Sequence, residues 1–415
     1  MRHPLPEDIV CFELGSDETQ AWLGSRHALE DDWAAIERLA ARGTIQLEVR
    51  SDAVTIRGVT RVGLVVLPTG RRLVIRSKIP SIKLIEWLAY LDEFPWFTAW
   101  LSEAGVGTGD AWHQCLARLF LRAMELVTQR HLRKDYVASP SDRSEVRGRI
   151  LTAALGRRLH RLPRLPQIQR QRTFDMPFNA VLALALDRLP AMLADQEGQD
   201  RRRMGWLREQ WAGILRQSDD PASTVTAAQW ACPSGYRDAI QLARLILRGA
   251  SLDPDSNAGG QSFTLPLADL WERALRRMCD QLTGPPGWNR LPDNQRVRRW
   301  DDPTGCHDRK RWLSADVIVQ RADYRWVLDA KYKREFADES REDRFQMCAY
   351  ALAFDADRVT LVYPSATAED ASRELLRANV GGKSLVIDSL ALPMAAGVEP
   401  CRTALAEAAE QILQQ

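Results

Sequence analysis

The chain has 415 residues, of which 45% are hydrophobic and 27% are charged, and its formal net charge is +2. These are ordinary globular values, so general disorder is excluded, and the small net charge does not by itself indicate a nucleic-acid binder. The length suggests two or three domains, each long enough to bury its own core. The seven cysteines are scattered without a Cys-x-x-Cys pair, which indicates reduced thiols rather than a disulfide framework.

Targeting and membrane signals are absent from the sequence. The first ten residues lack the apolar centre of a signal peptide, and no run approaches the roughly 18 apolar residues of a membrane span. We therefore expect a cytoplasmic protein that does not associate with membranes. Cys306-His307 is the one adjacent pair of soft ligands, and such a pair alone does not predict a zinc site.

The N-terminal region begins with two predicted helices, residues 17–23 and 31–42, both with acidic first turns. Residues 44–80 then alternate apolar and polar side chains in short runs broken by glycine and proline. This alternation is typical of an antiparallel meander or a small barrel. We predict an N-terminal β-rich domain over residues 1–95.

Helical spacing dominates the middle of the chain, in residues 81–136, 178–196 and 203–217. Residues 251–262 are rich in aspartate, serine and glycine, the composition of a loop or linker. We predict a mostly helical middle domain over residues 96–255 and a final domain over residues 262–415.

One segment of the middle domain is strongly basic. Between Arg143 and Arg172 nine arginines face a single acid, Glu145. Such density suits phosphate contact, and Arg147, Arg149, Arg157 and Arg158 are the candidate DNA-binding residues, with Arg161 beside them. A docking surface for an acidic protein and a solvated face are equally compatible with this charge.

Lysine is rare in this chain. Only seven of the 57 basic residues are lysines, and two of them stand in the run Val327-Leu328-Asp329-Ala330-Lys331-Tyr332-Lys333. Against an arginine-rich background, a lysine suggests a role for a compact ammonium whose pKa can be moved, which guanidinium cannot fill. Lys331 is therefore a candidate catalytic residue.

The pattern around Lys331 predicts a mixed sheet flanked by helices. Residues 267–278 and 340–354 have helical spacing, and residues 311–333 are a predicted β-hairpin with a turn at 321–324. Strands at 358–364 and 383–390 and a closing helix at 401–414 follow. The fold class is thus α+β multidomain, with an α/β final domain.

Polar residues fall where this hairpin brings them together. Asp329 and Lys331 are two apart on one strand and so share a face, while Asp316 lies on the preceding strand. Two converging carboxylates supply the hard oxygen ligands that Mg²⁺ prefers, and a bound metal assists phosphodiester hydrolysis. Gln346 and Tyr350 are four apart on the next helix and can orient the lysine or a phosphate.

Each of these pieces has an ordinary structural explanation. An Asp-x-Lys pair is commonly a surface pair, Gln346 and Tyr350 can be a polar helix edge, and Glu272 can pair with Arg276 at i,i+4. The ordered set of aspartate, Asp-x-Lys and Gln-x-x-x-Tyr is much less probable by chance than any one member. The set favours a nuclease site.

This ordered set resembles the PD-(D/E)xK nuclease superfamily, and the chain resembles the McrC family, nuclease subunits of McrBC-type modification-dependent restriction systems. Residues 61–80, 131–150 and 171–186 carry the wider likeness, and Glu272 stands where the family has a helix glutamate. Ala315 replaces the usual proline of the first motif, and Trp271 replaces a phenylalanine. Neither departure removes a ligand.

The resemblance implies a restriction-endonuclease-like final domain with Mg²⁺ as cofactor. Asp316, Asp329 and Glu272 would hold the metal, and Lys331, Gln346 and Tyr350 would complete the catalytic set. The chain would cleave double-stranded DNA containing methylcytosine, and its N-terminal part would dock on a McrB-like AAA+ ring and stimulate its GTPase. The chain lacks a G-x-x-x-x-G-K-[ST] phosphate loop, which fits a subunit whose GTP is bound by the partner.

Two other functions stay open at the level of sequence. The nuclease fold can be a scaffold that acts only as a GTPase activator, although the intact Asp316, Asp329 and Lys331 argue against a decayed site. A stand-alone DNA repair nuclease would cut without nucleotide or partner and without regard to cytosine modification.

Overall fold

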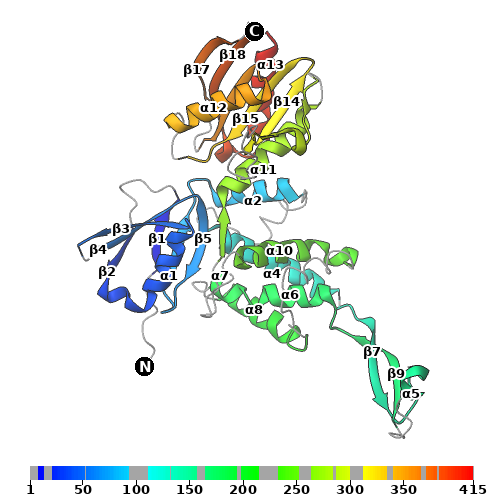
Figure 1. The fold of residues 1–415 in the computed structure, drawn as a ribbon. Coiled ribbons are helices and arrows are strands. Elements are labelled where there is room, and N and C mark those ends of the chain that lie inside the picture. Colours follow the sequence, from blue (N-terminus) through cyan, green and yellow to red (C-terminus); the bar gives the residue numbers. More distant parts are fainter. Residues whose placement is uncertain are drawn as a thin grey trace. The chain divides into compact units, whose positions relative to one another are not determined.

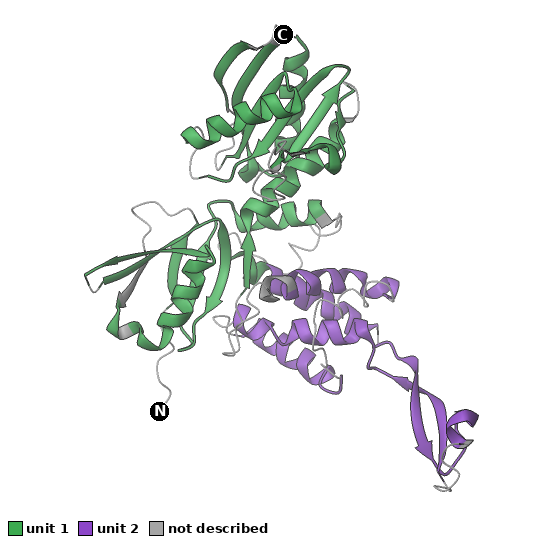
Figure 2. Ribbon diagram, viewed as in Figure 1, with its two compact units in different colours: residues 1–115, 253–415 green, residues 116–252 purple. Residues whose placement is uncertain are grey.

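The computed structural model divides the chain into two compact units, residues 1–115 with 253–415, and residues 116–252 (Figure 2). The residues that the structure describes are 8–13, 21–51, 53–92, 111–130, 132–156, 164–193, 198–214, 232–251, 263–283, 287–299, 312–333, 340–365, 371–380 and 383–414. Almost all of the predicted linker 251–262 lies outside them. The predicted domains 1–95 and 262–415 both belong to unit 1, and the predicted middle domain contains unit 2.

The N-terminal part of unit 1 is built from two small sheets and one helix (Figure 1). The strands are β1 (Ile9–Phe12), β2 (Ala21–Ser25), β3 (Ile45–Arg50), β4 (Ala53–Gly58), β5 (Arg61–Val66) and β6 (Arg72–Arg76). α1 (Glu30–Ala41) buries Ile36 and Leu39 in the core shared by both sheets. The alternating pattern of residues 44–80 is confirmed, with β3 and β4 antiparallel and β5 and β6 forming a hairpin.

The helix predicted at residues 17–23 is wrong where the structure describes it. Ala21 and Trp22 begin β2, which pairs with Ile56 and Thr55 of β4. Pairing with a neighbouring strand outweighs the weak local preference that the acidic residues suggest.

A strand from far along the chain completes the N-terminal sheet. β10 (Phe263–Pro266) runs antiparallel to β5 and gives the sheet the order β1-β6-β5-β10. Gly63 makes this pairing possible, because a Cβ at this residue would lie 2.0 Å from the carbonyl oxygen of Phe263. The polypeptide therefore returns to unit 1 through the N-terminal sheet before it enters the final domain.

Unit 2 combines helices with a long β-ribbon. Its helices are α4 (Trp112–Gln129), which starts in unit 1, and α5 (Thr152–Gly156), α6 (Pro177–Leu186), α7 (Leu189–Met192), α8 (Gln199–Gln210) and α10 (Arg237–Ser251). The ribbon pairs β7 (Asp135–Arg143) with β9 (Leu165–Thr173), and β8 (Arg149–Ile150) joins β9. The arginine-rich segment is thus largely a ribbon that projects from the helices of its own unit (Figure 2).

The final domain contains a mixed six-stranded sheet in the order β11-β14-β15-β16-β18-β17. Its strands are β11 (Asn289–Arg290), β14 (Val317–Arg321), β15 (Tyr324–Ala330), β16 (Arg358–Pro364), β17 (Ala371–Val380) and β18 (Lys383–Leu392). A separate pair joins β12 (Val297–Arg299) and β13 (Trp312–Ser314). The predicted hairpin is confirmed, since β14 and β15 are antiparallel, while β15, β16 and β18 are parallel.

Helices cover this sheet and connect it to the N-terminal part of unit 1. They are α2 (Ser81–Asp92), α11 (Leu267–Asp280), α12 (Arg341–Phe354) and α13 (Val398–Gln414). α12 packs on one face, where Met347 and Phe354 join a core with Val327 and Val359 (Figure 1). The Trp271 indole of α11 lies edge-on to Trp87 of α2 and donates to the Val362 carbonyl of β16 at 3.0 Å. No helix in the described part of the chain is long and apolar enough to span a membrane.

Candidate active site

Two aspartates meet at one end of the β14–β15 hairpin. Val317 pairs with Leu328, so continuing the antiparallel register by one residue places Asp316 opposite Asp329. Asp316 stands just before β14, not within the strand as the sequence predicted, because its carboxylate accepts a hydrogen bond from the Ala330 backbone N–H at 2.8 Å. The side-chain bond holds Asp316 at the sheet without a regular backbone pair.

The negative charges of Asp316 and Asp329 repel one another. Burial raises the pKa of Asp316, and nearby Glu272 raises it further, against the hydrogen bond from Ala330. Burial also raises the pKa of Asp329, and the Asp316 charge adds to that effect while Lys331 opposes it. Two buried like charges side by side are costly, and a cation is the natural compensation.

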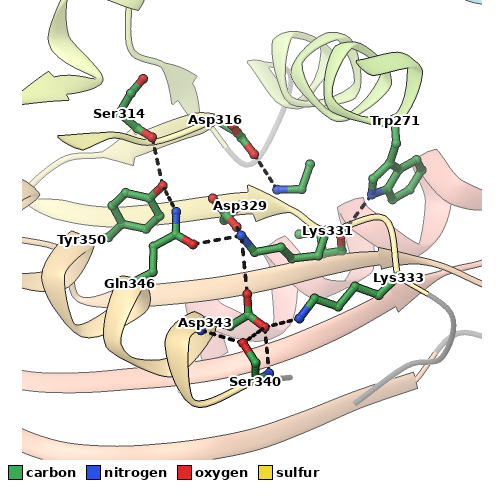
Figure 3. A network of polar contacts seen from close by, with 12 residues as sticks. Trp271, Ser314, Asp316, Asp329, Lys331, Lys333, Ser340, Asp343, Gln346 and Tyr350 are labelled. Atoms are coloured by element: carbon green, nitrogen blue, oxygen red, sulfur yellow. Dashed lines mark hydrogen bonds and ion pairs between the residues drawn. The ribbon is translucent and has the colours of Figure 1, made fainter. Parts of the chain in front are cut away.

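Lys331 lies immediately after β15, but its backbone still pairs with the sheet. Its N–H donates to the Val362 carbonyl at 2.9 Å, so it shares a face with Asp329 as predicted. The ammonium lies 2.8 Å from Asp329 Oδ2 as an ion pair, although not as an aligned hydrogen bond, and donates to Gln346 Oε1 at 2.9 Å (Figure 3). The Lys331 side chain keeps 19% of its surface exposed, so it is not fully enclosed by the site.

Gln346 and Tyr350 fix the position of that ammonium. The Gln346 amide nitrogen donates to the Tyr350 hydroxyl at 2.6 Å, and the hydroxyl donates to the Ser314 carbonyl at 2.9 Å (Figure 3). These bonds orient the Gln346 carbonyl oxygen toward Lys331. Burial, followed by the charges of Asp329 and Asp316, raises the pKa of Tyr350, so the phenol stays protonated and can donate. The structure thus brings the predicted Gln-x-x-x-Tyr pair to the lysine.

Glu272 pairs with Arg276, four residues further along the same helix. Its carboxylate forms an ion pair with Arg276 on α11, and the Arg276 guanidinium also donates to the Asp316 carbonyl oxygen at 3.2 Å. Glu272 is close enough to raise the pKa of Asp316. Its role as a metal ligand stays a prediction, and that role would require it to exchange Arg276 for the metal.

Asp343 belongs to the site, although the sequence analysis did not identify it. It lies in the first turn of α12, where Ser340 and Asp343 form a capping box, and its Oδ1 lies 3.7 Å from the Lys331 ammonium. The same carboxylate pairs with Lys333. Burial alone would raise the pKa of Asp343, but hydrogen bonds from Lys333 and Ser340 outweigh it and lower the pKa. The Ser-x-x-Asp spacing was the available signal, and it indicates only a helix start.

The donor set fits a divalent cation. Asp316 and Asp329 are buried hard-oxygen donors with raised pKa values, and each directly neighbours a member of the Val317–Leu328 pair. No group of three histidine, cysteine, aspartate or glutamate side chains in the described residues is already arranged to hold a metal. Arg276 and Lys331 lie close enough to these carboxylates to lower the pKa of Asp316. The metal-binding set remains a prediction.

The candidate DNA-binding arginines lie in unit 2, partly within the described residues. Arg147 and Arg149 flank Gly148 on the ribbon, where a Cβ would lie 2.1 Å from the Ile168 carbonyl oxygen. Arg149 is exposed, and Arg147 pairs with Glu145 at 2.7 Å. Arg157, Arg158 and Arg161 lie outside the described residues.

Comparison with known proteins identifies the family. Residues 56–364, about three quarters of the chain, match the family described as McrBC 5-methylcytosine restriction system component. The chain belongs to this family. The match spans Asp316, Asp329, Lys331 and the helix that carries Gln346 and Tyr350, so the site geometry lies within the McrBC family region.

Two solved assemblies from Thermococcus gammatolerans contain similar chains. A chain of the refined half-complex from the tetradecameric assembly of McrB AAA+ hexamers with bound McrC aligns with a TM-score of 0.66 and 16% identity, covering 98% of this chain and 100% of that chain. A chain of the McrBC complex aligns with a TM-score of 0.42 and 15% identity, covering 67% of this chain and 88% of that chain. The first alignment shows a shared fold. No curated protein matches the sequence.

Proposed function

We propose that the chain is the Mg²⁺-dependent DNA endonuclease subunit of a McrBC-like restriction complex. The observation that carries the proposal is the Lys331 ammonium, held within 2.9 Å of Asp329 and Gln346 beside the Asp316 carboxylate. This arrangement suits a polyanionic substrate, because a partly exposed cation stands next to two carboxylates that favour a metal. Membership of the McrBC family makes DNA containing methylcytosine the proposed substrate.

The reaction would be hydrolysis of a phosphodiester. A water oxygen forms a bond to phosphorus, the bond from phosphorus to the leaving sugar oxygen breaks, the water gives up one proton, and the leaving oxygen takes up one. Mg²⁺, when bound by Asp316 and Asp329, would supply Lewis acidity and ease deprotonation of the water. Lys331 would stabilise the negative charge that grows on the phosphate oxygens. Gln346 and Tyr350 would hold the Lys331 ammonium in place for that contact.

The proposed partner is a McrB-like AAA+ GTPase ring. The similar Thermococcus chain belongs to an assembly of McrB AAA+ hexamers with bound McrC, and the two chains cover one another almost completely. The N-terminal part of unit 1 would dock on the ring and stimulate GTP hydrolysis there. GTP would be bound by the partner, because this sequence contains no phosphate-loop motif.

Lys331→Ala tests the chemical assignment. The variant should lose DNA cleavage while it still folds and binds to the ring, with a lower thermal unfolding midpoint because buried Asp329 loses its ion-pair partner. Lys83→Ala is the matched control, because Lys83 also pairs with a carboxylate, Glu86 at 2.8 Å, but lies on α2. It should cut at the wild-type rate. Unchanged cutting by Lys331→Ala would end the assignment.

The biological setting is tested with methylated and unmethylated plasmid in the presence of Mg²⁺, with and without the ring protein and GTP. Cutting that requires the partner, GTP and methylation supports the restriction function. Cutting by the chain alone, whatever the methylation, would make it an autonomous nuclease. Stimulation of GTP hydrolysis without cutting under any condition would leave a GTPase-activating scaffold.

A further inference from the structure

A buried carboxylate, Glu13, links the N-terminal sheet to the strand that carries Lys331. Glu13 follows β1 and is 4% exposed. It accepts hydrogen bonds from the Ser77 hydroxyl at 2.9 Å and from the Lys78 backbone N–H at 2.9 Å. The Tyr332 hydroxyl, 319 residues away in sequence, lies 3.0 Å from both Glu13 carboxylate oxygens. The carboxylate is therefore enclosed by donors from two distant parts of unit 1.

Lys78 strengthens the same junction. Its ammonium donates to the Lys333 carbonyl at 3.0 Å and lies 5.3 Å from the centre of the Tyr332 ring. Ser77 and Lys78 belong to the basic run before Pro80, one of the stretches in which the sequence resembles the family. Their side chains and backbone thus contact Glu13, Tyr332 and Lys333 directly, and we call Glu13, Lys78 and Tyr332 the clasp.

The clasp acts on the residue next to Lys331. Neighbouring side chains of an extended chain point to opposite sides, so Tyr332 reaches Glu13 while Lys331 reaches Asp329 and Gln346. β15 ends at Ala330, and after Lys331 the backbone has left the regular strand. The clasp fixes Tyr332 and Lys333 from outside the sheet, at the place where strand pairing no longer does so.

A buried carboxylate bonded to a phenol is not required for stability alone. Burying a carboxylate and a phenol costs desolvation free energy, and an apolar contact of similar size is commonly as stable or more so. Trp87 and Trp271 make such an apolar contact within the same unit, with ring centres 6.1 Å apart. Hydrogen bonds add direction, and direction matters where the next residue must be held in a reactive geometry.

We propose that the clasp of Glu13, Lys78 and Tyr332 positions the Lys331 ammonium, so that the N-terminal part of unit 1 sets the competence of the nuclease site. The clasp residues are positioning residues, since none touches the Lys331 ammonium itself. The inference rests on the proposed function of Lys331 in DNA cleavage. A displacement of about 1 Å at a catalytic group can lower a rate by up to about 100-fold, so loss of the clasp should lower kcat and leave KM unchanged.

Tyr332→Phe in the full chain tests the clasp, because it removes only the hydroxyl. Tyr90→Phe is the matched control, because the Tyr90 hydroxyl on α2 also bonds to a distant segment of unit 1, Gln281 at 2.8 Å, but does not contact the clasp. Two readouts are compared with wild type. They are kcat and KM for plasmid cleavage with the ring, GTP and Mg²⁺, and hydrogen–deuterium exchange of the backbone amides of residues 327–333.

The proposal expects Tyr332→Phe to lower kcat at least about tenfold at unchanged KM and to speed exchange at the Lys331 amide, while Tyr90→Phe changes neither. Wild-type kcat in Tyr332→Phe, or slower cutting without faster exchange, would overturn it. If Tyr332→Phe does not fold, Lys78→Met is judged by the same two criteria. If wild type does not cut, the proposed function fails. The exchange measurement then decides by itself whether the clasp holds the strand: faster exchange in Tyr332→Phe supports the clasp, and unchanged exchange overturns it.

Discussion

Asp316→Asn should abolish the stabilisation that Mg²⁺ gives to the protein without unfolding it. Asparagine keeps an oxygen that can accept the hydrogen bond from the Ala330 N–H, so the local backbone contact survives. The substitution removes a buried charge whose pKa is raised by burial and by Glu272, and which itself raises the pKa of Asp329. The metal-free variant should therefore be at least as stable as wild type, although it lacks a proposed ligand.

The size of the effect follows from binding linkage. A ligand at ten times its Kd stabilises the folded state by about 1.4 kcal/mol. The final domain, from β10 to α13, spans residues 263–414. In a domain of roughly 150 residues, each kcal/mol of stabilisation raises the Tm by about 2–4 °C. Wild type should therefore gain about 3–6 °C on addition of saturating Mg²⁺, and Asp316→Asn should gain none.

Differential scanning fluorimetry with and without Mg²⁺ measures this directly. Asp388→Asn is the control, because Asp388 is also a buried carboxylate of the same sheet but is paired with Arg358 at 2.8 Å and with Thr360. Asp388 is in register with Thr360 and Leu328, so it lies on the face opposite Asp329. This variant should begin at a lower Tm and keep the full Mg²⁺ increment. An equal increment in wild type and Asp316→Asn would refute metal binding by Asp316.

Three other predictions address the surroundings of the site. Gln346→Met keeps the side-chain volume but removes the link between Lys331 and Tyr350, so it should lower kcat about 10- to 100-fold at unchanged Tm, and a wild-type rate would contradict this. The lowered pKa of Asp343 means that its stabilising contribution is full above its ordinary pKa of 3.8 and is lost as the pH falls through the folded value. Asp343→Asn should therefore lower the free energy of unfolding by about 1 kcal/mol near pH 7, measured by urea titration. The difference in stability between wild type and variant should vanish in acid, and a difference that does not change with pH would contradict this. Replacing exposed Arg149 and Arg172 by alanine should reduce the slope of log K for DNA against log salt by about 2, and an unaltered slope would leave the ribbon as a docking surface for a protein or a solvated face.

Several elements of the final domain could be predicted because local sequence encodes local geometry. Two short apolar runs, residues 317–319 and 326–328, on either side of a polar turn give the hairpin, and helical spacing with a Ser-x-x-Asp start gives α12. The two-residue step from Asp329 to Lys331 and the four-residue step from Gln346 to Tyr350 place each pair on one face whatever the surrounding fold. The candidate catalytic residues were therefore accessible from spacing and chemistry.

Other features depend on segments that meet only after folding. β10 pairs with β5 although about 200 residues separate them, and the sequence of neither strand shows which strand it pairs with. Asp343 reaches Lys331 only because α12 packs over the end of β15, and Glu13 meets Tyr332 across 319 residues.

The sequence by itself determined several strands and helices of the final domain and the faces that its candidate catalytic residues share, since periodicity acts over a few residues. Only the tertiary structure decided which carboxylates surround the ammonium and which distant segment holds its strand. Those contacts arise from the packing of whole sheets and helices, where burial and hydrogen bonding between distant residues outweigh local preference.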